Sequence, residues 1–211
     1  HEVNQPLSAI VTHASAGTRW LKQAVPQIEK AINNFTKIEE SGVRASGIIS
    51  ALCSLAKQAP ANLEFLDLKS VVSDVLGFLE TDARATGTNI ECALADGGKI
   101  FADPIQVQQV VLNLVTNALD AMEGALNKAL SVRLETRENV VVLAVKDSGP
   151  GIPVEVRNSI FEPFFTTKEQ GLGMGLAICK TIAEVHGGTL AIGSSNPTGT
   201  TMVFTLPITA E

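Results

Sequence analysis

Disulfides, tyrosine and long apolar runs are scarce or absent in this 211-residue chain, and each absence narrows its class. Cys53, Cys92 and Cys179 are odd in number and widely spaced, so neither a disulfide framework nor a zinc site is indicated. No apolar run approaches the ~20 residues of a membrane-spanning helix, so no membrane contact is expected. The net charge of −6, without a stripe of basic residues, argues against nucleic acid as the main partner.

The chain begins with His1 rather than methionine, which indicates a piece of a longer protein. We therefore expect an upstream sensor domain to be missing from it. A cytoplasmic location is the expectation for this piece, because its few cysteines fit a reducing compartment. Whether the whole protein carries a membrane anchor stays open. The 45% hydrophobic content is sufficient for a full core.

Residues 1–57 carry a helical pattern of apolar residues at alternating steps of three and four. One such seam lies between residues 3 and 24, and a second lies between residues 35 and 56. Two seams joined by a turn predict an antiparallel hairpin. Because each helix has one narrow apolar stripe, we expect two copies to pair into a dimeric four-helix bundle. His1 lies roughly opposite the first seam, so its imidazole is expected to face solvent.

Residues 58–65 are interpreted as a linker, and residues 66–211 mix helices with strands. Grouped helices against a mixed sheet predict a two-layer α/β sandwich, so the overall class is α+β. Helices are expected near 68–86, 104–123, 153–160 and 174–186, and strands near 89–94, 130–137, 140–146, 189–194 and 200–206.

An unusual polar stripe follows Asp103-Pro104, which has the pattern of a helix N-cap with proline in the first turn. The stripe is rich in amides rather than in lysine and glutamate. Neutral amides can contact a polyphosphate without repelling it, and an amide oxygen is a suitable ligand for Mg²⁺. An amide-rich surface or a helix-packing network is the alternative. The stripe consists of Gln106, Gln109, Asn113, Asn117 and Asp120.

The segment Asp147-Ser148-Gly149-Pro150-Gly151 follows an expected strand. A carboxylate at a strand end can accept a hydrogen bond from an exocyclic amino group such as that of adenine, and the glycines permit close approach. Taken alone, this spacing also fits many ordinary turns between a strand and a helix.

A second glycine-rich segment, Gly171-Leu172-Gly173-Met174-Gly175, leads into an expected helix. Backbone amides beside a helix N-terminus form a site for anionic phosphates. The spacing is neither of the Walker nor of the Rossmann type. Residues 161–168 precede it as an apolar anchor with a short polar stretch. Lys168 at its end is placed to reach a terminal phosphate, although most single surface lysines are simply solvated.

In this order the segments closely resemble the histidine kinases of two-component signalling. The ATP-binding part resembles the fold that these kinases share with gyrase, heat-shock chaperones and mismatch-repair ATPases. The resemblance covers nearly the whole sequence. Residues 1–7 are similar to the phosphoacceptor box, 113–120 to the asparagine box, 147–151 to the first glycine box, 161–168 to the phenylalanine box and 171–175 to the second glycine box.

The resemblance implies that ATP phosphorylates His1 and that the phosphoryl group then passes to an aspartate of a response-regulator receiver domain. Glu2 is expected to hold the proton on the other imidazole nitrogen. Asn117 is implied as the Mg²⁺ ligand, and Asp147 as the partner of the adenine amino group. The other implied nucleotide contacts are Asn113, Asp120, Gly149, Gly151, Phe164, Thr167, Lys168, Gly171, Leu172, Gly173, Met174, Gly175 and Leu176.

Two other functions stay open from the sequence. One is an ATPase of the same fold that drives a conformational change without a phosphohistidine. The other is a nucleotide-binding dimeric scaffold without kinase activity. Gln5 stands where many relatives of the kinases carry Thr or Asn, so phosphatase activity is also open, as is transfer within one chain or across the dimer.

Overall fold

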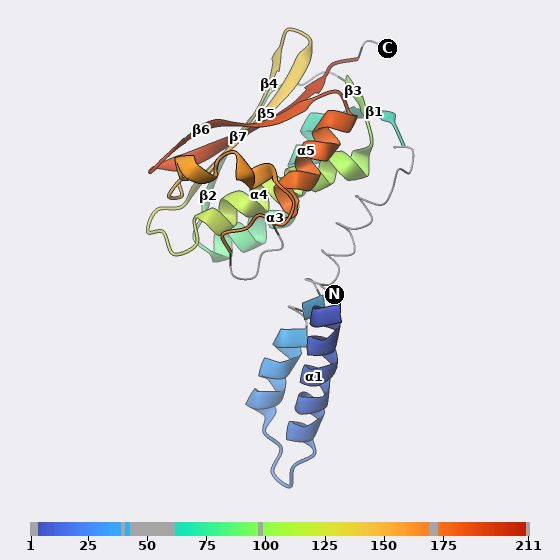
Figure 1. The fold of residues 1–211 in the computed structure, drawn as a ribbon, viewed down its shortest axis with the longest axis vertical. Coiled ribbons are helices and arrows are strands. Elements are labelled where there is room, and N and C mark those ends of the chain that lie inside the picture. Colours follow the sequence, from blue (N-terminus) through green and yellow to red (C-terminus); the bar gives the residue numbers. More distant parts are fainter. Residues whose placement is uncertain (1–3, 39–40, 43–61, 97–98, 169–172, 210–211) are drawn as a thin grey trace. The chain divides into compact units, whose positions relative to one another are not determined.

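The computed structural model describes residues 4–38, 41–42, 62–96, 99–168 and 173–209. The chain divides into two compact units, His1–Gln58 and Ala59–Glu211, and each unit is described by itself (Figure 1). Within the described ranges, no helix has the length and apolarity needed to cross a bilayer.

The first unit contains helix α1 (Asn4–Leu21) and a second helical segment at residues 28–38, which runs back along it (Figure 1). His13 Nδ1 lies 3.0 Å from Asn34 Oδ1 and joins the two segments. Ala31 is 1% exposed. The second segment starts seven residues before the seam predicted from residue 35, because Pro26 ends the turn early enough for residues 28–34 to be helical.

The second unit is built on a five-stranded sheet whose order is β2-β4-β5-β7-β6. The β2–β4 pair is parallel, and the other pairs are antiparallel. Helices α3, α4 and α5 cover one face, which confirms the expected two-layer α/β sandwich (Figure 1). The strands are β2 (Asn89–Leu94), β4 (Ala129–Arg137), β5 (Val140–Lys146), β6 (Thr189–Asn196) and β7 (Gly199–Pro207), and the helices are α3 (Leu68–Ala85), α4 (Pro104–Ala121) and α5 (Gly175–Val185).

The core lies between the sheet and these helices. Alternate residues of β7 are buried, as expected for a strand with one covered face, and Phe204 at its middle is fully buried. The apolar face of α4 is buried too, so the polar stripe turns away from the sheet. The buried residues of α4 are Val107, Val110, Val111, Leu114, Val115 and Ala118.

Two predictions for this unit were wrong in detail. The short antiparallel pair β1 (Glu64–Asp67) and β3 (Lys99–Ala102) was not expected, and β1 begins inside the predicted linker. The helix expected at 153–160 is instead two 3₁₀ turns, η1 (Val154–Val156) and η2 (Ser159–Phe161). β-Branched valines and the central Asn158-Ser159 pair have low helix propensity, which explains why a continuous α-helix does not form.

His186 fixes the end of α5 against the start of α4. The buried ring donates from Nδ1 to the Ile182 carbonyl at 2.8 Å, and its Nε2 accepts from the Asp103 amide at 3.0 Å. Asp103 is in turn the N-cap of α4, since its Oδ1 accepts from the Ile105 and Gln106 amides. This chain of bonds sets the relative position of the two helices that carry the candidate site.

Candidate functional site

The polar stripe of α4 faces the beginning of α5. Asn113 and Asn117 are half-buried, and Asp120 is exposed. Asn113 also contacts the Cys179 thiol of α5, and its hydrogen bond lowers the pKa of that thiol. Burial outweighs the bond and raises the pKa of Cys179 to about 12. Cys179 therefore stays a neutral packing residue between the two helices at ordinary pH.

Asp147 lies one residue after β5 and is 6% exposed. Its Oδ1 accepts from the Gly149 amide at 2.7 Å and from the Thr200 amide at 3.2 Å. Burial raises the pKa of the Asp147 carboxyl, while these backbone bonds act in the opposite direction. Among the hydrogen bonds of the described residues, none involves Oδ2. This second oxygen is therefore the acceptor that the fold offers to a ligand amino group.

The loop after Asp147 is fastened to the end of α4. Ser148 Oγ accepts from the Ala129 amide at 2.9 Å and donates to the Asn127 carbonyl at 3.0 Å. Its backbone amide points at the Met122 sulfur, 3.4 Å away. Gly151 has a φ of 79°, and a Cβ there would collide with the Asn196 carbonyl, so this turn requires glycine. The carboxylate and the amide-bearing helix are thus held as one framework.

The second glycine segment reaches the same helix from the other side. Gly173 has a φ of 66°, and a Cβ there would collide with the Phe164 and Phe165 backbone. A Cβ built on Gly175 would lie 3.8 Å from Asn113 Oδ1 and 3.9 Å from Asn117 Nδ2. The N-terminus of α5, with Leu176 in its first turn, therefore faces the amides of α4. Its free amides and positive dipole end suit an anion at this place.

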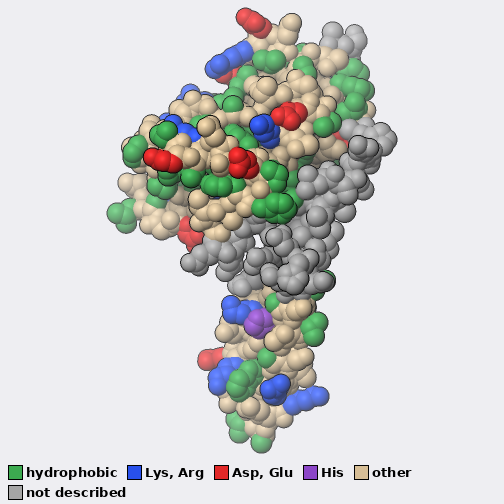
Figure 2. All heavy atoms as spheres, in the orientation of Figure 1, with side chains coloured by type: hydrophobic (Ala, Val, Ile, Leu, Met, Phe, Trp, Pro, Cys, Tyr) green, Lys and Arg blue, Asp and Glu red, His purple; other side chains and the backbone are tan. Residues whose placement is uncertain are grey.

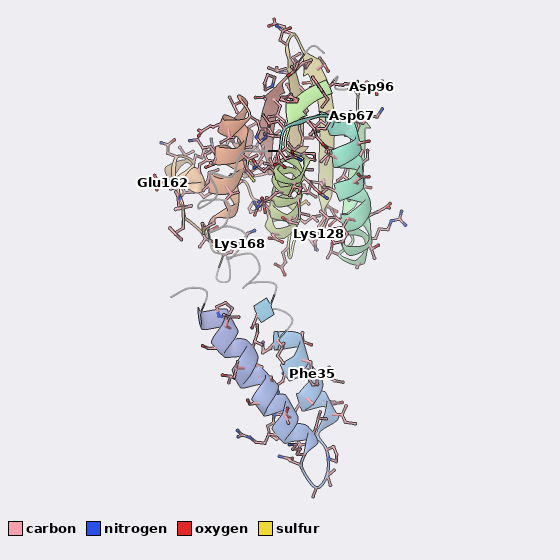
Figure 3. The ribbon with its side chains drawn as sticks, turned by 90° about the vertical axis from the view of Figure 1, so that its right-hand side faces the viewer. Phe35, Asp67, Asp96, Lys128, Glu162 and Lys168 are labelled. Atoms are coloured by element: carbon pink, nitrogen blue, oxygen red, sulfur yellow. The ribbon has the colours of Figure 1, made fainter. Side chains whose placement is uncertain are left out.

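Lys168 is the last of these residues, and it comes from the segment before the second glycine-rich segment. Its Nζ lies 2.7 Å from Asp120 Oδ2 and 3.2 Å from Asn117 Oδ1. Lys168 is labelled in Figure 3. Phe164 is 57% exposed and has a φ of 69°, and Thr167 is exposed. A positive φ at a bulky residue is unusual and indicates that the surrounding packing fixes this turn.

The donor set at Asn117 fits a hard cation. An amide oxygen and a carboxylate oxygen already share one ammonium group here, so the place accommodates positive charge. Oxygen ligands of this kind, completed by phosphates and waters, are those that Mg²⁺ prefers. The neighbouring N-terminus of α5 would receive the phosphates that accompany the ion.

The structure brings most of the predicted nucleotide residues into one connected arrangement. Asn113, Asn117, Asp120, Lys168 and Gly175 meet at the start of α5. The Asp147 loop, including Gly149 and Gly151, is tied to the last turn of α4, and Gly173 and Met174 lead into α5. His1, Glu2, Gly171 and Leu172 lie outside the described residues, and the roles of all these residues stay predictions.

Sequence reasoning missed the residues on β6 and β7 that support Asp147. The Thr200 carbonyl accepts from the Asp147 amide at 2.9 Å, so Thr200 brackets this residue through both backbone groups. Thr200 Oγ1 lies 3.0 Å from Ser195 Oγ, which accepts from the Ile152 amide at 2.7 Å. The only sequence signal is Gly199-Thr200 at the start of the last strand, and it predicts a strand without indicating its partner.

Comparisons with known proteins agree with this geometry. The pattern of the family described as "Histidine kinase-, DNA gyrase B-, and HSP90-like ATPase" matches residues 102–210. Sensor histidine kinase TmoS of Ectopseudomonas mendocina is 38% identical in an alignment 213 residues long, which covers 99% of this chain and 22% of that protein. The chain thus spans about a fifth of the length of that curated relative.

Two solved structures extend the comparison. The catalytic domain of histidine kinase ThkA is 32% identical with a TM-score of 0.63, and the match covers 69% of this chain and 95% of that domain. ThkA in complex with response regulator protein TrrA is 26% identical with a TM-score of 0.71, over 99% of this chain and 59% of that chain. The chain therefore belongs to the family of histidine kinase-, DNA gyrase B- and HSP90-like ATPases and, within it, to the sensor histidine kinases.

Proposed function

We propose that the chain uses ATP and Mg²⁺ to phosphorylate His1 and then passes the phosphoryl group to an aspartate of a response-regulator receiver domain. One observation carries this proposal: the amides of α4, the N-terminus of α5 and the buried carboxylate of Asp147 form one connected framework. A nucleotide needs an amino-group acceptor at one end and a phosphate site at the other. The framework offers both.

The nucleotide would lie along α4. Asp147 Oδ2 accepts from the adenine amino group, because Oδ1 is engaged by the Gly149 and Thr200 amides. Asn113 and the α5 amides near Gly175 bind the phosphates, and Asn117 holds Mg²⁺. When bound, the ion neutralises charge on the transferring phosphoryl group. The protein's part in catalysis is therefore positioning and electrostatics.

The chemical step uses His1 as the nucleophile. A neutral imidazole nitrogen attacks the γ-phosphorus, the bond from that phosphorus to the β,γ-bridging oxygen breaks, and ADP leaves. Glu2 would hold the proton on the other ring nitrogen and stabilise the charge that develops there. The receiver aspartate then attacks the same phosphorus and regenerates the imidazole. A hinge at residues 58–63 is part of this proposal, because nucleotide and acceptor belong to different units.

The helical unit supports a homodimeric four-helix bundle. It exposes large apolar side chains along both helical segments, and Figure 2 shows several of them at its surface. Such a stripe on short helices is stabilised by a second copy that covers it. The exposed positions on these segments are Leu7, Val11, Leu21, Ile28, Ile32 and Phe35.

The response-regulator partner is supported by the relative whose solved complex contains one, namely ThkA with TrrA. The proposed location of the chain is the cytoplasm, a reducing compartment that its few cysteines fit. An upstream sensor domain would regulate the reaction, and the greater length of TmoS leaves room for one.

Radiolabelled ATP tests the proposal directly. The wild-type chain should acquire acid-labile, alkali-stable label, whereas His1→Gln should acquire none. Asn117→Ala should also remain unlabelled while its dimer persists in sedimentation.

Label that persists in His1→Gln would place the acceptor elsewhere. Release of inorganic phosphate at the same rate from wild type and His1→Gln, without labelled protein, would identify an ATPase. Nucleotide binding in calorimetry without either label or phosphate release would identify the nucleotide-binding scaffold.

A further inference from the structure

Lys168 contacts two oxygens of the α4 stripe. Its ammonium group lies 2.7 Å from Asp120 Oδ2 and 3.2 Å from Asn117 Oδ1. The Lys168 and Asp120 side chains are 44% and 55% exposed, so the pair is held at the surface and can separate without disturbing the core.

The contact with Asn117 conflicts with metal binding at the same atom. The Lys168 ammonium group already donates to Asn117 Oδ1, so a metal ion bound to this oxygen would share it with a second positive charge. A magnesium ion needs the same oxygen at about 2.0–2.1 Å, in an octahedral shell that tolerates little distortion. The two cations would also repel each other across this short distance, and solvent screens that repulsion only in part because the Lys168 side chain is 44% exposed.

The ion pair with Asp120 holds Lys168 in this position. The carboxylate lies three residues after Asn117, almost one helical turn along α4, so both oxygens point toward the same side. Lys168 comes from the segment before the second glycine run, far away in the sequence. Its ammonium group is thus recruited to α4 by a fixed negative charge.

We propose that Lys168, anchored by Asp120, competes with Mg²⁺ for the Asn117 amide oxygen. Magnesium-nucleotide binds only when Lys168 leaves this position, so the Lys168–Asp120 pair sets the magnesium concentration that the site requires. The idea rests on the proposed nucleotide binding, which it deepens by assigning a regulatory role to Asp120. Asp120 acts here through Lys168, as a positioning residue.

Calorimetry with ADP at a series of magnesium concentrations measures the competition. Lys168→Met should lower the magnesium concentration for half-maximal ADP binding by about two- to fivefold, the range expected for loss of one exposed ion pair. Lys168→Arg keeps the positive charge and should stay near wild type. Lys69→Met breaks a comparable exposed pair, Lys69–Asp96 at 2.6 Å, and should change nothing. An unchanged or higher magnesium requirement in Lys168→Met overturns the proposal.

Limited trypsinolysis tests the anchor without nucleotide, because trypsin must take the Lys168 side chain out of its ion pair before it cleaves there. Asp120→Asn should accelerate cleavage after Lys168 by about two- to fivefold. Glu123→Gln, a neighbouring change in charge on an acid with no part in the pair, should leave the rate unaltered. A cleavage rate that Asp120→Asn does not change overturns the anchoring role. Failure of the wild type to bind ADP would instead refute the proposed function. The cleavage rates would still show whether Asp120 anchors Lys168.

Discussion

The two units of the chain differ in where their apolar residues go. The sandwich buries large side chains such as Phe204, Leu143 and Leu68 almost completely. The helical segments bury mainly small residues, with Ala31 at 1% exposure, and leave Val11 at 66% and Ile32 at 58%. The sandwich therefore contains its own core, whereas the helical unit exposes an apolar surface that the proposed dimer would cover.

This contrast separates stability from assembly within one chain. Changes in the sandwich should alter folding or nucleotide binding and leave the dimer intact. Changes on the helices should alter the dimer and leave nucleotide binding intact. Trp20, the single tryptophan of the chain, belongs to the helical unit, so its fluorescence reports on that unit alone.

The largest expected effect is the loss of a core aromatic. Phe204→Ala should lower the free energy of unfolding of the sandwich by about 3–5 kcal/mol, because it leaves a cavity in the core between the sheet and the helices. Phe204 is fully buried and lies opposite Leu143 on one side and Leu190 on the other. Circular dichroism of the sheet should show an earlier urea transition, with the Trp20 transition unmoved. Coupled movement of both transitions would show that the units do not unfold separately.

The next effect concerns the dimer. Ile32→Asp places a charge in the exposed apolar stripe and should weaken dimerisation by about 2–4 kcal/mol, the range of an interface hot spot. Sedimentation at micromolar concentration should show monomers. The matched control is Asn33→Asp, which adds the same charge at the adjacent exposed polar position and should leave the dimer in place. If both variants remain dimeric, the stripe is not the interface.

Within the sandwich, Asp147→Asn should lower the affinity for ADP without lowering the stability of the fold. The amide oxygen still accepts from the Gly149 and Thr200 amides, but an NH₂ group now faces the adenine amino group. ADP affinity should fall by about 1.5–3 kcal/mol, as expected for losing a hydrogen bond to a charged group. The measurement is calorimetry. An affinity equal to that of wild type would mean that adenine lies elsewhere.

The pH dependence of the unfolding free energy shows whether the Asp147 carboxyl stabilises or destabilises the folded protein. Burial raises the pKa of Asp147 in the folded protein, so folding takes up a proton between the unfolded and folded pKa values. The contribution of this carboxyl to stability is full at acid pH and is lost as the pH rises through the folded pKa. Asp147→Asn should therefore be at least as stable as wild type at neutral pH, and its stability should depend less on pH in that window.

Much of the sandwich was predictable because its elements carry regular patterns. The valine-rich run from Val140 and the N-cap at Asp103 indicate a strand and a helix from local sequence alone. β1 and β3 were missed because four residues are too few to show a clear alternation of apolar and polar positions. The two strands form through their pairing with each other. The 3₁₀ turns at 154–161 depend on Arg157, whose guanidinium donates to the Ile152 and Ser195 carbonyls.

The candidate site was predictable to the extent that its motifs are contiguous in sequence. Asn117, Asp147 and Gly175 were identified from spacing and from the family resemblance. The support of Asp147 by Thr200 follows from the register between β5 and β7, which the sequence does not encode locally. The approach of Lys168 to Asp120 depends on the path of the segment between them in the fold. Local patterns therefore indicate the candidate site residues, and tertiary pairing decides which other residues hold them in place.

The smallest expected effect lies back in the helical unit, where a surface contact supports the turn. Lys30 Nζ sits 4.4 Å from the centre of the Trp20 ring, and such a cation–π contact at an exposed site contributes about 0.5–1 kcal/mol. Lys30→Met should shift the Trp20 unfolding transition by that amount and leave the sandwich transition unchanged. Lys22→Met is the control, since it removes another exposed lysine of the helical unit. The helical unit has little buried core, so even this weak contact should shift its unfolding transition by a measurable amount. Removal of the exposed Lys69–Asp96 pair should shift the transition of the more stable sandwich much less.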